Sequence, residues 1–366
     1  MHTPQAISNF SGGPGALAPI VLQKASQALL ALPETGISVL GMSHRSDWFR
    51  QLLDQAENNI RTLLDVPSHY HVLFLQGGGS LQFNMIAMNF ARGQGTRADY
   101  LQTGYWSAKA VDAVRAQTQV HLAWNGANSG YARLPKSEEM SWSARPSYVH
   151  YVDNETVEGL EFNRVAGLVD APLMCDMSSN LMSRPVDVSA YDLIYAHAQK
   201  NLGPAGVTVV IVKDDLVQTA NAGLPAVLDY RTHIKARSIY NTPPVFAIYV
   251  LKEVTQWLLD DVGGLEKMAA INLQKSQLLY RTLDELSDFY RPHAQREDRS
   301  RMNCTFDLVN QKLLKQWLMQ AQDQQLWGLE GHRSLGGIRA SLYNAVSLQD
   351  VQKLSQFLKN FAQENA

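Results

Sequence analysis

A strand-like run, three glycines and a helix-like segment follow one another between residues 72 and 91, and this order constrains the fold most. The run Val72 to Leu75 is continuously apolar, and Gly77 to Gly79 separate it from helical spacing over Leu81 to Ala91. Strand, glycine turn and helix in this order make one half of a βαβ unit. The segment therefore predicts a sheet that is covered by helices.

Similar apolar runs recur further along the chain. They are Leu168-Val169, Leu173 to Asp176, Leu193 to Ala196 and Val207 to Val212. Continuous apolar runs separated by turns are typical of strands that are buried on both faces, as in a parallel sheet between layers of helices. We therefore expect an α/β fold with a mainly parallel sheet.

The length of 366 residues favours two domains rather than one small core. An opening segment rich in glycine and proline predicts an arm over residues 1–16. We place a large α/β domain over residues 17–260 and a smaller α+β domain over residues 261–366. Gly263-Gly264, which follow a long helical segment that begins near Val245, are the expected hinge.

Charge and cysteine content argue against several classes of function. The 32 lysines and arginines nearly balance the 34 aspartates and glutamates, so the chain as a whole is not drawn to nucleic acid or to an anionic membrane. Cys175 and Cys304 lie far apart, which argues against a disulfide framework or a zinc site. No apolar run approaches the length of a membrane span, and the opening residues lack a secretory signal pattern. We expect a cytoplasmic protein without a metal, a membrane or a nucleic-acid partner.

A lysine and an aspartate mark the ends of two predicted strands. Lys200 lies after the run Leu193 to Ala196 and before a glycine-proline turn, at the edge where open α/β sheets bind ligands. Asp176 ends the run LMCD. From position alone, Lys200 could be a surface-loop residue and Asp176 a helix N-cap. Together they suit pyridoxal 5'-phosphate, whose pyridine nitrogen needs an adjacent carboxylate to stay protonated.

Two further features could serve the same cofactor. Gly77 to Gly79 and Ser80 open a predicted helix, so backbone N–H groups and the helix dipole can face a phosphate. The sequence carries neither the GxGxxG dinucleotide pattern nor a GxxxxGK[ST] phosphate loop. Trp106 could stack on a pyridine ring, although a tryptophan can equally pack in the core.

Arginines next to histidines occur at two separated places. His44-Arg45 follow a short apolar segment, while His332-Arg333 and Arg339 lie close together near the end of the chain. A guanidinium group binds carboxylate or phosphate with two parallel hydrogen bonds, so two such places suit a substrate with two anionic groups. Surface ion pairs are the alternative explanation for any one of these arginines.

All of these residues lie in sequence blocks that resemble the phosphoserine aminotransferases, a class V family of the fold-type-I pyridoxal phosphate enzymes. The resemblance runs nearly end to end, and many blocks in one order at one spacing make it specific. The blocks are NFSGGPG at Asn9–Gly15, SHRS at Ser43–Ser46, LQGGGSLQF at Leu75–Phe83, TGYWS at Thr103–Ser107, DNET at Asp153–Thr156, DMSSNLMSRP at Asp176–Pro185, AQKNLGPAG at Ala198–Gly206, YNTPP at Tyr240–Pro244 and GHRSLGGIRASLYNA at Gly331–Ala345.

The resemblance implies a large domain with a mainly parallel seven-stranded sheet between helices, followed by a small α+β domain. It also implies that Lys200 would bind pyridoxal 5'-phosphate covalently and move the substrate proton, while Asp176 would pair with the pyridine nitrogen. Trp106 would stack on the ring, and Thr156 would hydrogen-bond near its 3-oxygen. Other cofactor contacts would come from Gly79, Ser80, Gln199 and, reaching across a homodimer from the neighbouring subunit, Asn241 and Thr242.

The same resemblance implies a substrate site and a reaction. Arg339 would bind the substrate α-carboxylate, and a phosphate or distal carboxylate would be received, partly across the dimer interface, by His44, Arg45, His332 and Arg333. The reaction would be reversible transamination between L-glutamate and 3-phosphohydroxypyruvate, giving O-phospho-L-serine and 2-oxoglutarate for serine biosynthesis. A second activity would be the 4-phosphohydroxy-L-threonine step of pyridoxine biosynthesis. This chain departs from some relatives in having Ser80 where they carry arginine and Gly12 where they carry serine.

Two alternatives stand beside this prediction. Another class V enzyme, an alanine–glyoxylate aminotransferase or a cysteine desulfurase, would share the fold, but desulfurases need a cysteine on a mobile loop and commonly a histidine before the lysine. Here Gln199 precedes Lys200. A non-catalytic dimer of this fold is the other alternative, and such sensors normally carry an added DNA-binding segment. The matching blocks, which run from Asn9 to Ala345, leave no room for one.

Overall fold

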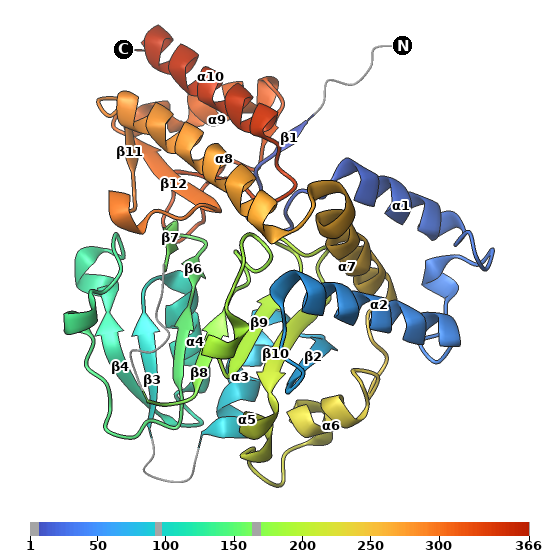
Figure 1. Ribbon diagram of the computed structural model, residues 1–366. Coiled ribbons are helices and arrows are strands. Elements are labelled where there is room, and N and C mark those ends of the chain that lie inside the picture. Colours follow the sequence, from blue (N-terminus) through green and yellow to red (C-terminus); the bar gives the residue numbers. More distant parts are fainter. Residues whose placement is uncertain (1–6, 92–96, 163–169, 366) are drawn as a thin grey trace.

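A seven-stranded sheet forms the centre of the computed structural model, which describes residues 7–91, 97–162 and 170–365 (Figure 1). Its strands follow the order β2-β10-β9-β8-β5-β3-β4. Their bounds are Tyr70–Leu75 for β2, Arg97–Gln102 for β3, Gln119–Asn125 for β4, Val149–Val152 for β5, Leu173–Asp176 for β8, Leu193–His197 for β9 and Thr208–Lys213 for β10. The predicted run Leu168-Val169 lies outside the described residues.

The sheet is mainly parallel, as the sequence predicts, and β10 is the exception. Strands β3, β4, β5, β8 and β9 pair in parallel, whereas β10 runs antiparallel to both β2 and β9. Only residues 198–207 connect β9 to β10. A parallel pair needs a crossover connection of a dozen or more residues, so the chain turns directly back. That short return segment contains Lys200.

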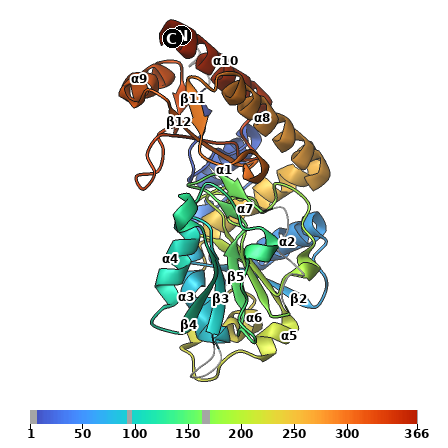
Figure 2. The ribbon, with the colours of Figure 1, turned by 90° about the vertical axis from the view of Figure 1, so that its left-hand side faces the viewer.

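Helices cover both faces of the sheet (Figure 2). Along β2, Val72 and Phe74 point into one core cluster, while Leu73 and Leu75 point into the other, as the alternation of a strand requires. The helices of the first layer are α1 (Pro19–Leu30), α2 (Asp47–Leu64) and α7 (Val245–Trp257), and those of the second are α3 (Gly78–Phe90), α4 (Tyr105–Val114), α5 (Asp214–Gln218) and α6 (Tyr230–Lys235).

The C-terminal part of the chain forms a separate core cluster against a three-stranded antiparallel sheet (Figure 1, orange and red). Its elements are α8 (Leu265–Glu285), β11 (Tyr290–Pro292), β12 (Asn303–Leu308), α9 (Leu314–Asp323), β13 (Leu326–Trp327), β14 (Ile338–Ser341) and α10 (Leu348–Asn365). A π-helical turn, η6 (Leu258–Val262), and Gly263-Gly264 link α7 to α8. The boundary at residue 260 falls in this turn, and the division into domains stays a prediction.

Short elements complete the described fold. A two-stranded hairpin, β6 (Asn154–Glu155) and β7 (Leu160–Glu161), follows β5. The remaining turns are η1 (Val39–Gly41), η2 (Gly126–Ser129), η3 (Ser137–Glu139), η4 (Val188–Ala190), η5 (Ala226–Leu228), η7 (Arg296–Asp298) and η8 (Gln311–Leu313). In the part of the chain that the structure describes, no helix combines the length and the apolar character needed to cross a membrane.

The described part of the predicted N-terminal arm, residues 7–16, lies against the C-terminal part of the fold. Strand β1 (Ser8–Asn9) pairs in parallel with β13, and Phe10 is fully buried in the C-terminal core cluster. The hydroxyl of Ser8 donates a hydrogen bond of 2.6 Å to Asp350. The glycines that follow are thereby carried to the edge of the central sheet, where Gly15 N–H donates to the carbonyl of Gln199.

Candidate active site

The carboxyl ends of the parallel strands open into a cavity of about 160 Å³. Strand β8 ends there with Asp176, β9 leads through His197 to Lys200, and β5 leads into the β6–β7 hairpin. Open α/β sheets bind their ligands at this edge. The cavity is lined by Gly78, Gly79, Ser80, Phe83, Trp106, Val152, Asn154, Thr156, Asp176, His197, Gln199 and Lys200.

Lys200 is buried, with 5% of its surface exposed, so it is not the surface-loop residue that position alone allows. Its Nζ donates hydrogen bonds to the hydroxyls of Thr156 and Ser179, the latter at 2.9 Å. Burial lowers the pKa of Lys200 to about 8, and the Arg339 charge acts in the same direction, while Asp176 opposes both. A neutral amine is therefore accessible near physiological pH. Sequence reasoning missed Ser179, whose only signal was its place in the DMSSNLMSRP block.

Asp176 makes a local turn contact and also lies at the cavity. Its carboxylate accepts a hydrogen bond of 2.8 Å from the Ser178 N–H, which is a local turn contact. It is also buried at the cavity, where burial raises its pKa while the Lys200 charge and the hydrogen bonds from Ser178 lower it. A Cβ built on Gly79 would lie 3.5 Å from Asp176 Oδ2, so the carboxylate is close to the first turn of α3.

The N-terminus of α3 presents uncapped amides to the cavity. Gly77 has φ 91° and Gly78 has φ 65°, which are left-handed values that favour glycine. No side chain caps the helix. Gly79 and Ser80 line the cavity, so N–H groups and the positive end of the helix dipole are available to an anion there. Gln199 lines the same cavity beside Lys200.

Trp106 is held by a buried glutamate that sequence reasoning missed. Glu155 accepts hydrogen bonds from the backbone N–H groups of Trp106, at 3.0 Å, and Ser107, at 2.9 Å. A second glutamate, Glu158, accepts one from the Tyr105 N–H at 2.9 Å. Two glutamate side chains thus cap the first turn of α4 from a distant part of the chain, and burial raises the pKa of both. The one sequence signal for Glu155 was its place in the DNET block.

The ring of Trp106 faces the lysine. Its centroid lies 5.5 Å from Lys200 Nζ, and Trp106 lines the cavity rather than the core. Among the described residues, the buried indole Nε1 has no hydrogen-bond partner. A buried donor without a partner is costly, which indicates that a bound group supplies the acceptor.

Arg339 is a partly buried cation without an ion-pair partner among the described residues. Burial lowers the pKa of this guanidinium group, while Tyr343 and Glu158 raise it. Its side chain lies directly over Gly12, where a Cβ would come within 2.2 Å of Nη2. Gly12 is therefore required for this position of Arg339. A serine there, as in some relatives, would displace the guanidinium group.

The two histidine–arginine pairs lie in different places. The ring of His332 packs 4.6 Å from the ring of Tyr105 at the start of α4, near the cavity, whereas Arg333 is exposed. His44 and Arg45 instead line a separate groove. Within one chain, His332 thus lies beside Tyr105, the neighbour of the cavity residue Trp106, whereas His44 and Arg45 lie in a different groove.

Asn241 and Thr242 are exposed and do not line the cavity of their own chain. Asn241 Nδ2 donates a hydrogen bond of 3.1 Å to Gln76 Oε1, and Gln76 Nε2 donates one of 2.5 Å to the carbonyl of Thr242. Because Gln76 directly precedes the glycine turn of α3, these contacts hold both residues near the edge of the site. Their contact with a neighbouring subunit's cofactor stays a prediction.

Neither cysteine is placed to act as a nucleophile. Cys175 and Cys304 are free, fully buried and absent from the cavity lining. Burial raises the pKa of the Cys175 thiol, and it raises that of Cys304 to about 12. A thiolate, which is the reactive form, is thus disfavoured at both positions.

Comparison with known proteins decides the family. The model of the family described as Aminotransferase class-V matches residues 7–354. The chain belongs to the class V aminotransferases. Within this family, the phosphoserine aminotransferase of Bacillus subtilis (strain 168) is 44% identical over 358 residues, which cover 98% of this chain and 99% of that protein.

Solved structures give the same result and identify the cofactor. A structure showing radiation damage of the Schiff base in phosphoserine aminotransferase has a TM-score of 0.95 at 43% identity, covering 99% of this chain and 100% of that chain. The PLP-bound phosphoserine aminotransferase of Trichomonas vaginalis has a TM-score of 0.91 at 35% identity, covering 97% and 100%. This class V protein is an aminotransferase that uses pyridoxal 5'-phosphate.

The residues of the cavity fit that cofactor. The uncapped N-terminus of α3 suits its phosphate, the buried Lys200 suits its aldehyde, and Asp176 suits its pyridine nitrogen. The unpaired indole N–H of Trp106 also points to a group that is bound there. Each feature is independent of the sequence comparison.

Proposed function

We propose that this aminotransferase converts L-glutamate and 3-phosphohydroxypyruvate reversibly into 2-oxoglutarate and O-phospho-L-serine. The observation that carries the proposal is the unpaired guanidinium group of Arg339 beside the Lys200 cavity, in a chain that matches phosphoserine aminotransferases over nearly its whole length. A fixed cation without a counter-ion suits the α-carboxylate that the amino donor and the product share.

The cavity lining supports most of the cofactor contacts that we propose. Bound pyridoxal phosphate supplies an electron sink for the carbanion that forms when an amino acid loses its α-proton. We assign the covalent attachment to Lys200, the pairing with the pyridine nitrogen to Asp176 and the ring contact to Trp106. Phosphate contacts are assigned to Gly79, Ser80 and Gln199 on one chain and to Asn241 and Thr242 of the neighbouring subunit.

The lysine also moves the proton in this proposal. Its lowered pKa lets the amine accept a proton near neutral pH, and a base with a pKa close to the working pH is the most effective. The hydroxyls of Thr156 and Ser179 accept hydrogen bonds from Nζ and orient it. Thr156 and Ser179 also bond to each other at 2.7 Å, which limits the rotation of both hydroxyls.

The distal part of the substrate requires further cations. A phosphate and a γ-carboxylate are both oxyanions, so arginine and histidine donors can accept either one. His332 contacts Tyr105 of α4 in the same chain and Arg333 follows it in sequence, whereas His44 and Arg45 lie in a separate groove. We infer that His44 and Arg45 serve the site of the neighbouring subunit in a homodimer. The related four-carbon phosphorylated acid of pyridoxine biosynthesis would fit the same groups.

Absorbance spectroscopy tests the cofactor, the amino donor and the acceptor in a single titration. The purified holoenzyme should show a visible band that moves to the near ultraviolet when glutamate is added. Addition of 3-phosphohydroxypyruvate should restore the band. A band that glutamate leaves unchanged would contradict the amino-donor assignment, and recovery with pyruvate but not with the phosphorylated acid would contradict the acceptor assignment.

A further inference from the structure

A second cavity, of about 680 Å³, lies between α8 and the loop that precedes β12. None of its residues lines the Lys200 cavity. Four arginines dominate it, and we call it the arginine groove. The groove is lined by Leu273, Ser276, Gln277, Tyr280, Arg281, Asp284, Glu285, Arg296, Arg299, Ser300 and Arg301.

The groove holds more positive charge than its own carboxylates neutralise. Asp284 is shared between Arg296, at 2.9 Å, and Arg299, at 2.8 Å. Glu285 pairs instead with Lys359. Counting contacts among the described residues only, the side chains of Arg281 and Arg301 have neither an ion pair nor a hydrogen bond.

The residues outside the described ranges contain no acidic side chain that could pair with these arginines. Residues 1–6, 92–96, 163–169 and 366 include no aspartate and no glutamate. Two of the four guanidinium groups are therefore without a carboxylate side chain to pair with, and the other two share one. Such an excess is what a multivalent anion would neutralise.

Arg299 is held rigidly in the groove and keeps one N–H donor without a partner among the described residues. The guanidinium of Arg299 stacks 4.7 Å from the ring centroid of Tyr280, and it makes two hydrogen bonds to Asp284. Its Nε is buried and has no partner in the described part of the chain. The hydroxyl of Tyr280 in turn donates to the carbonyl of Ser300 at 3.0 Å, which fixes the loop. This arginine therefore loses little conformational entropy when a ligand binds.

We propose that the arginine groove binds a small multivalent oxyanion, such as a phosphate ester or a polycarboxylate. Guanidinium groups bind such anions through paired hydrogen bonds in a fixed plane, and four of them around one cavity can contact several oxygens at once. The site is separate from the cofactor cavity and does not depend on the proposed substrate.

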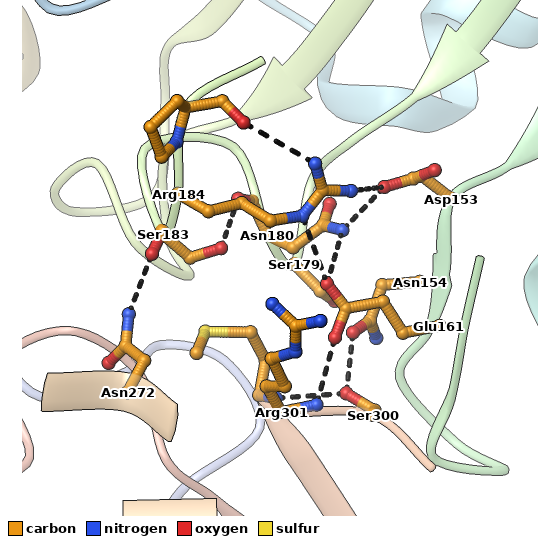
Figure 3. A network of polar contacts seen from close by, with 12 residues as sticks. Asp153, Asn154, Glu161, Ser179, Asn180, Ser183, Arg184, Asn272, Ser300 and Arg301 are labelled. Carbon is orange, nitrogen blue, oxygen red and sulfur yellow. Dashed lines mark hydrogen bonds and ion pairs between the residues drawn. The ribbon is translucent and has the colours of Figure 1, made fainter. Parts of the chain in front are cut away.

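Two residues of the groove form hydrogen bonds with the β6–β7 hairpin (Figure 3). Arg301 N–H donates a hydrogen bond of 2.9 Å to Glu161 on β7, and the Ser300 hydroxyl donates one of 2.6 Å to Asn154 on β6. Asn154 lines the Lys200 cavity. The anion would therefore bind to a loop that also supports the cofactor site.

Calorimetric titration with inorganic pyrophosphate tests the site, because pyrophosphate is a multivalent oxyanion that carries no amino group. The holoenzyme is compared with the double variant Arg281→Gln/Arg301→Gln at one fixed, low salt concentration. Binding at the active site is common to both proteins, so their difference isolates the groove. We expect the variant to lose one binding component or to bind it at least about ten-fold more weakly.

A second double variant, Arg97→Gln/Arg291→Gln, is the matched control, because both arginines are exposed, lie outside the groove and give the same change in charge. It should bind pyrophosphate as the wild type does. Unchanged circular dichroism and an unchanged cofactor band in the groove variant show that it is folded. Identical isotherms for the wild type and a folded groove variant would overturn the proposal.

Discussion

The Lys200 cavity differs from the separate groove that is lined by His44 and Arg45. The residues of a single chain complete the cavity to a greater extent than the groove. Lys200 and Asp176 are buried, and Lys200 is fixed by two hydroxyls. Arg45 is exposed and lines a groove that also contains Arg50, Lys235 and Arg237. The comparison shows that one chain supplies most of the residues assigned to the cofactor, while in our proposal part of the substrate half comes from a second chain.

Electrostatics explains the difference. A charge can be buried only where an opposite charge or several hydrogen bonds compensate it, as Asp176 and Lys200 do for each other. A group of cations with few acids cannot be buried alone, so it stays at the surface until an anion arrives. Arg339 is intermediate, because it is partly buried and unpaired.

Mixing two variants of low activity tests whether Arg45 serves the neighbouring site, and it has the largest expected effect. Lys200→Ala removes the amine and should lower turnover at least about 1000-fold. Arg45→Ala should leave its own chain's cavity intact and lower turnover about 100-fold through the neighbouring site. In a heterodimer, one of the two sites carries neither change, so a random mixture should regain about a quarter of wild-type turnover.

The control for this mixture is each variant refolded alone, which should stay inactive. Co-expression with two different tags allows the heterodimer to be purified and its turnover measured directly. If the heterodimer shows no recovery, Arg45 does not serve the neighbouring site, and the contrast between the two halves is wrong.

The pH dependence of cofactor uptake tests whether the pKa of Lys200 is lowered in the cofactor cavity. Burial lowers the pKa of Lys200 to about 8, so its reactive neutral form increases as the pH rises through 8. Uptake of pyridoxal phosphate by the cofactor-free protein should therefore speed up about ten-fold between pH 7 and 9 and then level off. Stopped-flow absorbance measures this rate. A rate that keeps rising to pH 10 would indicate an unperturbed lysine.

A smaller effect is expected from Glu155→Gln. The neutral amide would lose the charge-assisted hydrogen bonds to the N–H groups of Trp106 and Ser107. Such bonds contribute about 1.5–3 kcal/mol each. Their loss should displace Trp106 in part, and this displacement should weaken cofactor binding roughly five-fold. Equilibrium dialysis of the cofactor gives the dissociation constant.

Glu253→Gln is the matched control for this variant. Glu253 is a buried glutamate on α7 that pairs with Lys24 and Lys252, away from the cavity. It should lower thermal stability without changing cofactor affinity. Equal loss of cofactor affinity in both variants would mean that Glu155 acts through general stability rather than through Trp106.

Local patterns were enough to predict four strands of the sheet, β2, β8, β9 and β10, whereas β3, β4 and β5 followed only from the family resemblance. The run Leu173 to Asp176 is β8 itself, and the glycine turn at Gly77 to Gly79 does open a helix. Residues that follow a strand within a few positions, such as Lys200, fall at the sheet edge by geometry alone. These features depend on short stretches of sequence.

Features that depend on distant partners could not be predicted in this way. Glu155 caps α4 from 49 positions away along the chain, and no local pattern encodes that contact. The antiparallel direction of β10 depends on the length of one connection rather than on its apolar run. The close approach of Arg339 to Gly12 joins the two ends of the described chain, and only coordinates reveal it.

The pairing of β1 with β13 sets the order in which the protein can be completed during synthesis. Ser8 leaves the ribosome early, yet its partner Asp350 is 342 positions later. Gly12, which lies under Arg339, is part of the same segment. Because domains of a nascent chain fold as their residues emerge, this segment must wait until its partners, more than 300 positions later, have been synthesised. A nascent chain that has not yet reached Arg339 therefore lacks the contact between this guanidinium group and Gly12.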